Sequence, residues 1–407
     1  MDLNDERVDW RFKSLPADGR TVAELREARL GLFDGEFGTP LLTLDSEALA
    51  HNLELMARWA REHGLAHAPH GKTPLAPQLY DRQLALGAWG ITAATPTHVR
   101  MYRAFGVERI FLANELVEAA ALRWIAAELD ADPSFRFVCY VDSARGVELM
   151  DAALDRPLDV VVELGAHGSR TGVRTEAEAD AVADAVAASR HLRLVGVAGY
   201  EGTLPGADAA RTHVRRWLDG LVATAHRFDA AGRFAQADEI VVSAGGSEHF
   251  DLVAAALTEE ALRLSRPVLR LLRAGAYVTH DDLHYAAITP LRELRPALRL
   301  WTQVLSRPEP GLALVNAGKR DVPYDLGLPL PLEVRDAEGK VRAAEGISFT
   351  KLSDQHGFLS VPETDPLQVG DWVCLGLSHP CTAFEKWQLI PEVDATGTVV
   401  DYIRTFF

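Results

Sequence analysis

The sequence predicts an α/β protein that ends in a separate antiparallel β domain. From Thr39 to Tyr277, short β-branched or apolar runs alternate with longer segments of helical period, as in βα units around a parallel sheet. After Asp282 the pattern changes to short alternating runs separated by Gly, Pro and Asp, which is typical of antiparallel strands. Hydrophobic residues make up 48% and charged residues 25% of the chain, as in ordinary folded proteins.

The α/β part contains nine candidate strands. They begin near Pro40, Ala66, Trp89, Arg109, Phe135, Leu158, Leu192, Glu239 and Val268. A closed (β/α)8 barrel needs eight parallel strands, so in a barrel one strand, most simply the first near residues 40–44, belongs to another sheet. An open doubly wound sheet fits the same pattern. Asp45 or Ser46 is expected to open the first long helix, and Ser143 a later one.

The last third of the chain carries the predicted β domain. Its expected strands are LRLWTQVL, GLALVNAG, EGISFTKL, DWVCLGLS and WQLIPEVD, followed by TVVDYIRTF. The turn Ala395 to Gly397 predicts a hairpin that makes the last two strands neighbours. We therefore expect an N-terminal arm over residues 1–38, an α/β domain over 39–285 and a β domain over 286–407. An amphipathic stretch around residues 22–32 of the arm predicts packing or a dimer contact.

Charge and cysteine content limit the partners and the compartment. The 407 residues include 42 Lys and Arg against 58 Asp and Glu, a formal net charge of −16 that disfavours nucleic acid and anionic membranes. Three cysteines, Cys139, Cys374 and Cys381, are too few for a disulfide framework and fit a reducing cytoplasm. No signal peptide or membrane-length apolar run is present, so we expect a cytoplasmic protein.

Lys72 is the first candidate reactive residue. The segment LAHAPHGKTP places it at the end of a short strand, before a helix that we expect to start near Pro74. Side chains at the carboxyl ends of parallel strands line the ligand site, and a partly desolvated lysine can act as an amine nucleophile. A solvated loop lysine is the alternative.

Two glycine-rich turns follow later strands and could bind an anion. Ser243, Gly245, Gly246 and Ser247 connect a buried strand to a helix, where backbone amides attract phosphate. The spacing matches no nucleotide-binding fingerprint, and a capped tight turn explains it equally well. The turn RAGAY, with Gly275 and Tyr277, could add an amide and a hydroxyl to the same anion.

His379 and Cys381 form a candidate metal pair. Residues two apart on a strand face the same way, so this imidazole and thiolate could share one ion. Cys374 has the opposite parity, which predicts a core residue. A buried cysteine beside an incidental histidine remains the alternative. The sequence His280 to His284 imitates a helical zinc-protease motif, but Asp281 is one methylene shorter than the required glutamate, which disfavours that function.

Together these segments resemble the fold-type III pyridoxal-phosphate enzymes, in the branch of D-serine dehydratase and D-threonine aldolase. The resemblance runs from about Thr39 to Tyr402. The motifs that carry it are PHGKT, GITAAT, FLANELV, SRTGV, GYEG, SAGGS, RAGAY, NAGKRDVPYDLG, QHG and the terminal His-Pro-Cys. The resemblance implies a (β/α)8 barrel, with the cofactor at the carboxyl mouth and the first strand given to the C-terminal β domain.

The resemblance also implies roles for individual residues. Lys72 would hold pyridoxal 5'-phosphate covalently and, once released, exchange the α-proton of the substrate. Arg170 would sit beside the phenolic oxygen of the cofactor, and Tyr200 near its ring. The phosphate would be held by Gly246, Ser247, Gly275 and Tyr277, with Ser243 in the same turn.

The metal pair points to one branch of the family. His379 and Cys381 match the pair in the dehydratases, whereas the aldolases carry an aspartate in place of the cysteine. A thiolate and an imidazole favour Zn²⁺, which would help the 3-hydroxyl group to leave. Two departures lie near the site: Pro74 replaces a family histidine, and TAFEKW follows the metal cysteine.

We therefore expect a lyase, a zinc-dependent dehydratase of D-serine, D-threonine or 3-hydroxyaspartate that releases a 2-oxo acid and ammonia. The alternatives are a metal-dependent D-threonine aldolase, an amino-acid racemase and a non-catalytic cofactor-binding protein. The resemblance further implies a homodimer, which full activity of a sedimenting monomer would contradict.

Overall fold

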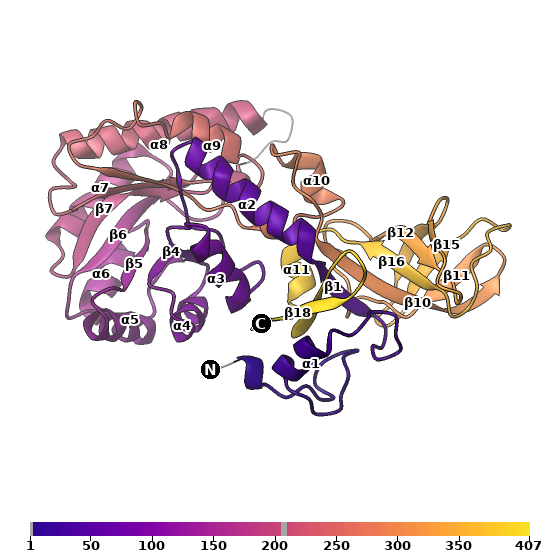
Figure 1. Cartoon of the computed structure of the whole chain (residues 1–407). Coiled ribbons are helices and arrows are strands. Elements are labelled where there is room, and N and C mark those ends of the chain that lie inside the picture. Colours follow the sequence, from indigo (N-terminus) through magenta and orange to yellow (C-terminus); the bar gives the residue numbers. More distant parts are fainter. Residues whose placement is uncertain (1–2, 205–209) are drawn as a thin grey trace. The chain divides into compact units, whose positions relative to one another are not determined.

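The computed structural model describes residues 3–204 and 210–407. The chain divides into two compact units, many of whose elements are labelled in Figure 1. One unit comprises Met56–Lys72 and Tyr80–Gly275, and the other comprises Met1–Leu55, Thr73–Leu79 and Ala276–Phe407. The domain boundaries expected after residues 38 and 285 stay predictions.

Eight parallel strands form the core of the first unit, with the order β2-β9-β8-β7-β6-β5-β4-β3. They are β2 (Ala66–His67), β3 (Ile91–Ala93), β4 (Arg109–Glu115), β5 (Arg136–Val141), β6 (Leu158–Leu164), β7 (Leu192–Gly199), β8 (Ile240–Ala244) and β9 (Val268–Leu272). An isolated parallel bridge between His70 and Thr92 joins the two ends of this sheet. The strands therefore close into a (β/α)8 barrel, as the resemblance implied, and not an open doubly wound sheet.

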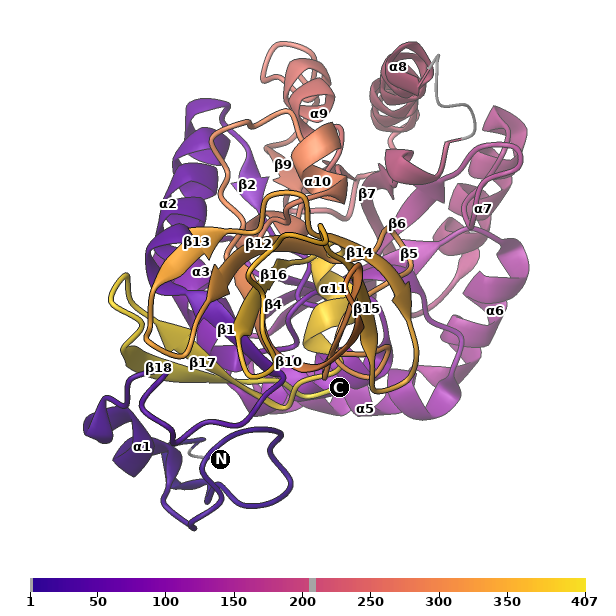
Figure 2. The same ribbon diagram turned by 90° about the vertical axis from the view of Figure 1, so that its right-hand side faces the viewer.

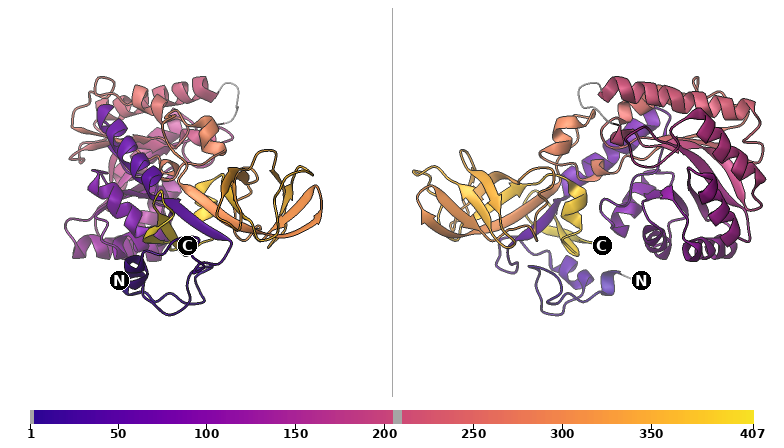
Figure 3. Two further views of the ribbon diagram at one scale, coloured as in Figure 1. Left: turned by 45° about the vertical axis from the view of Figure 1, so that its right-hand side comes forward. Right: turned by 180° about the vertical axis from the view of Figure 1, so that it is seen from behind.

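Helices cover the outer face of the barrel strands (Figures 1 and 3). They are α2 (Ser46–Glu62), α3 (Pro77–Ala85), α4 (Pro96–Ala104), α5 (Ala119–Ala131), α6 (Ala144–Ala153), α7 (Glu176–Ala188), α8 (Ala210–Ala230) and α9 (Phe250–Ala256). Asp45 accepts the Ala48 amide at 2.8 Å and Ser143 accepts the Gly146 amide at 3.2 Å, so both predicted caps are confirmed. Every residue of β8 is buried, because helices and the barrel interior cover both its faces.

A ten-stranded, mainly antiparallel sheet forms the second unit. Its strands are β1 (Leu41–Asp45), β10 (Leu298–Glu309), β11 (Leu312–Val315), β12 (Leu330–Arg335), β13 (Val341–Ala343), β14 (Ser348–Leu352), β15 (Gly357–Ser360), β16 (Trp372–Gly376), β17 (Leu389–Val393) and β18 (Val399–Arg404). β14 returns alongside β12, so part of the sheet curls around itself (Figure 2). The first seven residues of β10 alternate between buried and partly exposed, as expected for strands with one wet face.

Strand β1 is the ninth candidate strand, the one that does not belong to the barrel. It pairs with β10 antiparallel and with β17 parallel, and so belongs to the second sheet. β17 and β18 form the hairpin predicted from Ala395 to Gly397. The sequence missed β12, β13 and β15. β13 and β15 have only three and four residues, and β12 lacks a regular alternation of burial.

The N-terminal arm packs on this sheet. Helix α1 (Val22–Ala28) begins with a capping box at Thr21 and Glu24. Its buried residues join one hydrophobic cluster with the rest of the arm and with β1, β17 and β18: Val8, Phe12, Leu15, Val22, Leu25, Leu32, Phe37, Leu41, Leu389, Val399 and Tyr402. The arm contributes to a core within its own chain. Within the described residues, no helix combines the length and the apolar character that crossing a membrane requires.

Candidate functional site

Lys72 lies in the turn that follows the first barrel strand. After the bridge at His70, the chain turns through Gly71 and Lys72. A Cβ atom at Gly71 would lie 2.6 Å from the Tyr102 hydroxyl, so this close approach requires glycine. Lys72 is exposed at the carboxyl end of the barrel, where barrel enzymes carry their reactive groups.

The helix after Lys72 begins later than the sequence predicts. We expected Pro74 in its first turn, whereas α3 begins at Pro77. Leu75 has a left-handed backbone, with φ of 38°, and its carbonyl oxygen accepts the Phe406 amide at 2.9 Å. A helix cannot continue through such a residue. Pro77 therefore takes the first-turn position that we had given to Pro74.

Positive charges gather around Lys72. Burial, followed by the nearby charges of Lys72, Arg273, Arg170 and His98, lowers the pKa of His70 well below its usual value. The Nδ1 atom of His70 is buried and lacks a hydrogen-bond partner. Burial and Lys72 also lower the pKa of His98. An anionic ligand would balance this charge, so the barrel mouth suits an acidic group.

Arg170, Tyr200 and Gly246 pack together beside this charge. The Arg170 guanidinium lies 5.4 Å from the centre of the Tyr200 ring. Burial, with a smaller effect from Glu201, raises the pKa of Tyr200 to about 12, so its phenol is neutral at pH 7. A Cβ atom at Gly246 would lie 2.5 Å from the Tyr200 ring, so the glycine lets the ring approach the turn.

The turn that we expected to hold phosphate already has an anionic partner. Glu201 is 1% exposed, and its carboxylate accepts the Gly245 amide at 3.0 Å and the Gly246 amide at 2.8 Å. The amides of the turn therefore already have an acceptor, a carboxyl side chain of the protein, and phosphate binding there stays a prediction. The Gly246 amide is committed to Glu201, so a phosphate contact there needs Glu201 to move.

The other predicted phosphate residues differ in their surroundings. Ser243 is fully buried and donates its hydroxyl to the Leu271 carbonyl oxygen at 2.9 Å, which joins two barrel strands and leaves no hydroxyl for phosphate. Ser247 follows the glycine turn and is half-buried. A Cβ atom at Gly275 would lie 2.7 Å from the backbone oxygen of His70, so this glycine lies against the Lys72 segment. Tyr277 is buried in the short helix η3 (Ala276–Val278).

Arg273 is a site residue that the sequence analysis did not single out. It is 2% exposed and donates hydrogen bonds to the Tyr140 hydroxyl and the Gly199 carbonyl oxygen. Its Nε atom is buried without a hydrogen-bond partner. The signal in the sequence is its position directly after strand β9, at the start of RAGAY. It adds a fixed positive charge at the barrel mouth.

Three carboxylates meet at the ends of β4, β5 and β6. Oxygen atoms of Glu115, Asp142 and Glu163 all lie within 4.8 Å of one another. Burial, followed by the nearby carboxylate of Glu163, raises the pKa of Glu115 to about 9. Glu115 therefore holds its proton at pH 7. Each residue lies at or directly after the end of its strand, but the sequence analysis did not group them.

His379 and Cys381 come together by a different geometry from the one predicted. The expected strand β16 ends at Gly376, and Cys381 lies in the first turn of helix α11 (Pro380–Phe384). His379 caps this helix with a left-handed backbone, with φ of 51°. The argument from strand parity is therefore wrong. The two side chains still interact, because a hydrogen bond to Cys381 is the main cause that raises the pKa of His379 to about 9.

Two carboxylates hold His379. Asp325 Oδ2 lies 2.5 Å from His379 Nδ1, and Asp281 Oδ2 accepts the His379 amide at 3.0 Å. Asp281 belongs to the segment that imitates a protease motif. Helix α10 (His284–Ile288) starts only at His284, so the two histidines of that motif do not share a helix.

Cys381 and Cys374 have different surroundings. The Thr73 hydroxyl lies 3.2 Å from Cys381 Sγ. Cys374 lies within β16, and burial raises the pKa of its thiol. Cys374 thus has the surroundings of a core residue, as the sequence suggested.

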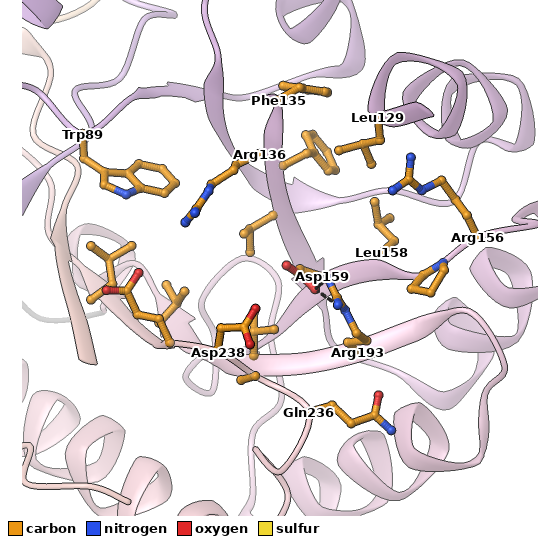
Figure 4. Close-up of a pocket in the computed structure, with 18 residues that line it drawn as sticks. Trp89, Leu129, Phe135, Arg136, Arg156, Leu158, Asp159, Arg193, Gln236 and Asp238 are labelled. Atoms are coloured by element: carbon orange, nitrogen blue, oxygen red, sulfur yellow. Dashed lines mark hydrogen bonds and ion pairs between the residues drawn. The ribbon is translucent and has the colours of Figure 1, made fainter. Parts of the chain in front are cut away.

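A cavity of about 270 Å³ lies at the opposite end of the barrel (Figure 4). Its lining includes the starts of β5, β6 and β7, and it contains the ion pair of Asp159 and Arg193 at 2.7 Å. Lys72, Arg170 and Tyr200 do not line it. In barrel enzymes the amino ends of the strands contribute to stability and the carboxyl ends to chemistry, so we place the candidate active site at the carboxyl ends.

Two protein-family models match the chain. The N-terminal domain of alanine racemase matches residues 44–282, and a putative serine dehydratase domain matches residues 297–393. The chain is 26% identical over 361 residues to a 3-hydroxy-D-aspartate aldolase of Paracoccus denitrificans strain Pd 1222. The aligned region covers 86% of this chain and 87% of the relative.

Solved structures share the fold. The crystal structure of a D-threonine aldolase from Filomicrobium marinum has a TM-score of 0.77 and 26% identity, and covers 93% of this chain and 97% of the other. A cysteine-to-alanine variant of D-threo-3-hydroxyaspartate dehydratase, in a metal-free form, has a TM-score of 0.70 and 21% identity, with coverage of 93% and 99%.

Proposed function

Because this chain belongs to the fold-type III pyridoxal-phosphate family, in the branch of D-serine dehydratase and D-threonine aldolase, we propose that it is a dehydratase of D-3-hydroxy amino acids. The reaction releases a 2-oxo acid and ammonia, and it uses pyridoxal 5'-phosphate and Zn²⁺. The His379 and Cys381 pair, at the start of α11, carries the choice of dehydration.

The barrel mouth fits the cofactor. Lys72 supplies the primary amine that an aldehyde requires, and Arg170 and Arg273 supply positive charge for an anion. The buried, unpartnered Nδ1 of His70 and Nε of Arg273 are further polar atoms that a ligand could satisfy. Ser247, Gly275 and Tyr277 would hold the phosphate, and Gly246 would add its amide only if Glu201 releases it. When bound, pyridoxal phosphate stabilises the carbanion that remains after loss of the α-proton.

The protein's own groups then handle the protons. Lys72 would take the α-proton once its amine is released from the cofactor. It lies near His70, whose buried ring has a lowered pKa. Arg170 would orient the substrate complex, and its packing on Tyr200 limits its movement. The neutral phenol of Tyr200 would lie near the ring of the cofactor.

The metal pair fits zinc and supports dehydration. Asp325 lies at Nδ1 of His379, so a metal would bind at Nε2. A thiolate binds zinc in preference to harder cations such as Mg²⁺. Zinc supplies a Lewis acid that makes hydroxide a better leaving group. The family resemblance adds that aldolases carry aspartate where this chain has Cys381. The metal-free form of a cysteine-to-alanine variant of a related dehydratase is consistent with a metal in that protein.

An aldolase is the second candidate. Two of the similar proteins, the 3-hydroxy-D-aspartate aldolase and the D-threonine aldolase, are named for carbon–carbon cleavage. In that reaction the proton of the 3-hydroxyl group is removed, the bond between Cα and Cβ breaks to release an aldehyde, and Cα takes up a proton to give glycine.

Product analysis separates the two candidates. We expect D-serine, D-threonine or D-3-hydroxyaspartate to release ammonia in proportion to turnover, with no glycine. Ammonia and glycine are the products to measure, because cleavage of hydroxyaspartate also yields a 2-oxo acid, glyoxylate. Glycine without ammonia would overturn dehydration in favour of the aldolase.

The metal dependence is tested with two cysteine variants. Cys381→Ala should lose zinc and slow ammonia release by about 10²-fold or more, since hydroxide then leaves without a Lewis acid. Cofactor absorbance should persist, because Lys72 is unchanged. Cys374→Ala, at the buried cysteine of β16, is the matched control and should keep both zinc and turnover. Unchanged zinc content in Cys381→Ala would refute the metal site.

A further inference from the structure

Asp325 holds the start of helix α11 with both of its carboxylate oxygens. It lies in the segment between β11 and β12, far from α11 in the sequence. Its Oδ2 atom lies 2.5 Å from His379 Nδ1, and its Oδ1 atom accepts the Thr382 hydroxyl at 3.1 Å. One side chain therefore contacts both the cap of the helix and its first turn.

The His379 backbone is fixed as well. Its amide donates to Asp281 Oδ2 at 3.0 Å, and its carbonyl oxygen accepts the Thr382 amide at 3.1 Å. Asp281 is 2% exposed and also accepts the amides of Leu283 and Tyr285 at 3.0 and 2.8 Å. With the backbone held in this way, the remaining freedom of His379 is the rotation and the tautomer of its ring.

A carboxylate at Nδ1 removes that remaining freedom. It accepts the Nδ1 proton, so the neutral ring carries its lone pair on Nε2, the atom that is then free to bind a metal. The geometry of Asp325 is therefore that of a residue which orients a metal-binding histidine.

We propose that Asp325 is the positioning residue of the zinc site, which selects the tautomer of His379 with its proton on Nδ1 and directs the lone pair of Nε2 toward the ion shared with Cys381. This inference rests on the proposed function, because it requires that His379 and Cys381 bind zinc. It adds a residue from NAGKRDVPYDLG, a segment to which the sequence analysis gave no chemical role.

The test measures zinc affinity and does not depend on turnover. The full-length protein is titrated with Zn²⁺ in competition with a chromophoric chelator, and Co²⁺ absorption reports the ligand geometry. Asp325→Ala should weaken zinc binding by about 10- to 100-fold, as expected when such a partner is lost. Asp325→Asn should stay within about threefold of wild type, because its carbonyl oxygen can still accept the Nδ1 proton.

Thr382→Val is the matched control. It removes the hydroxyl that contacts Asp325 Oδ1 and leaves the contact of Oδ2 with His379. Its zinc affinity should match that of wild type within about threefold, since Nδ1 keeps its acceptor. The Co²⁺ spectrum should change in Asp325→Ala and remain unchanged in the other two variants.

Each failure has a distinct meaning. Wild-type zinc affinity in Asp325→Ala would overturn the positioning role and leave the proposed function intact. Affinity in Asp325→Asn as weak as in Asp325→Ala would also overturn it, because charge and not ring orientation would then matter. A wild-type protein that takes up no zinc would overturn the proposed metal site itself. If Asp325→Ala does not fold, Asp325→Leu, which keeps a similar side-chain size and also removes the acceptor, takes its place with the same expected loss of affinity.

Discussion

Single carboxylates hold the turns on which the candidate site depends. Glu201 accepts two consecutive amides, Asp281 accepts the amide of His379 and caps α10, and Asp325 accepts the ring of His379. Glu201 and Asp281 satisfy backbone donors that a regular helix or strand would otherwise satisfy, whereas Asp325 satisfies a donor of the His379 ring. Such residues carry no periodic pattern, so their role follows from contacts and not from the local sequence.

Replacing Glu201 with alanine should destabilise the barrel. The amides of Gly245 and Gly246 would lose their acceptor next to a buried side chain, and unsatisfied buried donors cost about 1–3 kcal/mol. We expect the free energy of unfolding in urea to fall by that amount. Glu248→Ala, at a half-buried position of the same loop where the carboxylate makes only a long ion pair with His249, is the control and should change it by less than about 0.5 kcal/mol. Equal stability of the two variants would contradict the role of Glu201.

At the scale of elements, close contact between neighbouring barrel strands restricts their residues. Strand β7 contains Gly196, where a Cβ atom would lie 1.8 Å from the Val241 backbone oxygen of β8. The two strands pair in parallel at this point. Backbone atoms of a barrel strand cannot move aside without breaking the pairing, so the glycine is required by the closed sheet.

Two glycine-to-alanine variants test this restriction. Gly196→Ala should lower the free energy of unfolding by about 3 kcal/mol or more, because the added methyl group overlaps a strand backbone. Gly220→Ala provides the contrast, since Gly220 lies within helix α8 with open space around it. It should raise stability by about 0.5–1 kcal/mol through helix propensity. Thermal and urea unfolding measure both, and equal effects would refute the argument.

At the scale of the whole molecule, the chain has an excess of acidic residues, and three of them cluster within the barrel. The formal net charge is −16, and Glu115, Asp142 and Glu163 concentrate negative charge at three strand ends. Folding brings these carboxylates together from separate parts of the chain, so protons bind more tightly to the folded state than to the unfolded one. Stability should therefore depend on pH through this group.

The sign of the pH dependence follows from Glu115. Its pKa is raised from 4.5 to about 9 in the folded state, first by burial and then by Glu163. Its contribution to stability is present in full below about pH 4.5 and is lost as the pH rises through about 9. Glu115→Gln, which mimics the protonated form, should lose less stability than wild type between pH 5 and pH 9 in urea unfolding.

A matched variant controls for the general effect of removing a charge. Glu118→Gln changes an exposed residue before α5 whose side chain makes no capping bond. It should keep the pH dependence of wild type. If Glu115→Gln and Glu118→Gln show the same pH profile, the three carboxylates do not share a proton in the folded protein.

Local pattern was sufficient for the nine candidate strands of the α/β part and for the position of Lys72 after a strand. Buried parallel strands such as β8 read as continuous apolar runs, and each of the nine candidate strands exists within a few residues of its expected start. Lys72 follows a strand end, a position that sequence spacing alone can indicate. The hairpin of β17 and β18 likewise depends on a turn of three residues.

Contacts between distant segments were beyond the reach of that pattern. Glu201 accepts the Gly246 amide, and His379 meets Asp325 across 54 residues of sequence. The bend at His379 also replaced the expected strand with a helix cap. Periodicity reports which way neighbouring residues face, whereas these contacts arise only when the barrel and the sheet close and bring separate strand ends together.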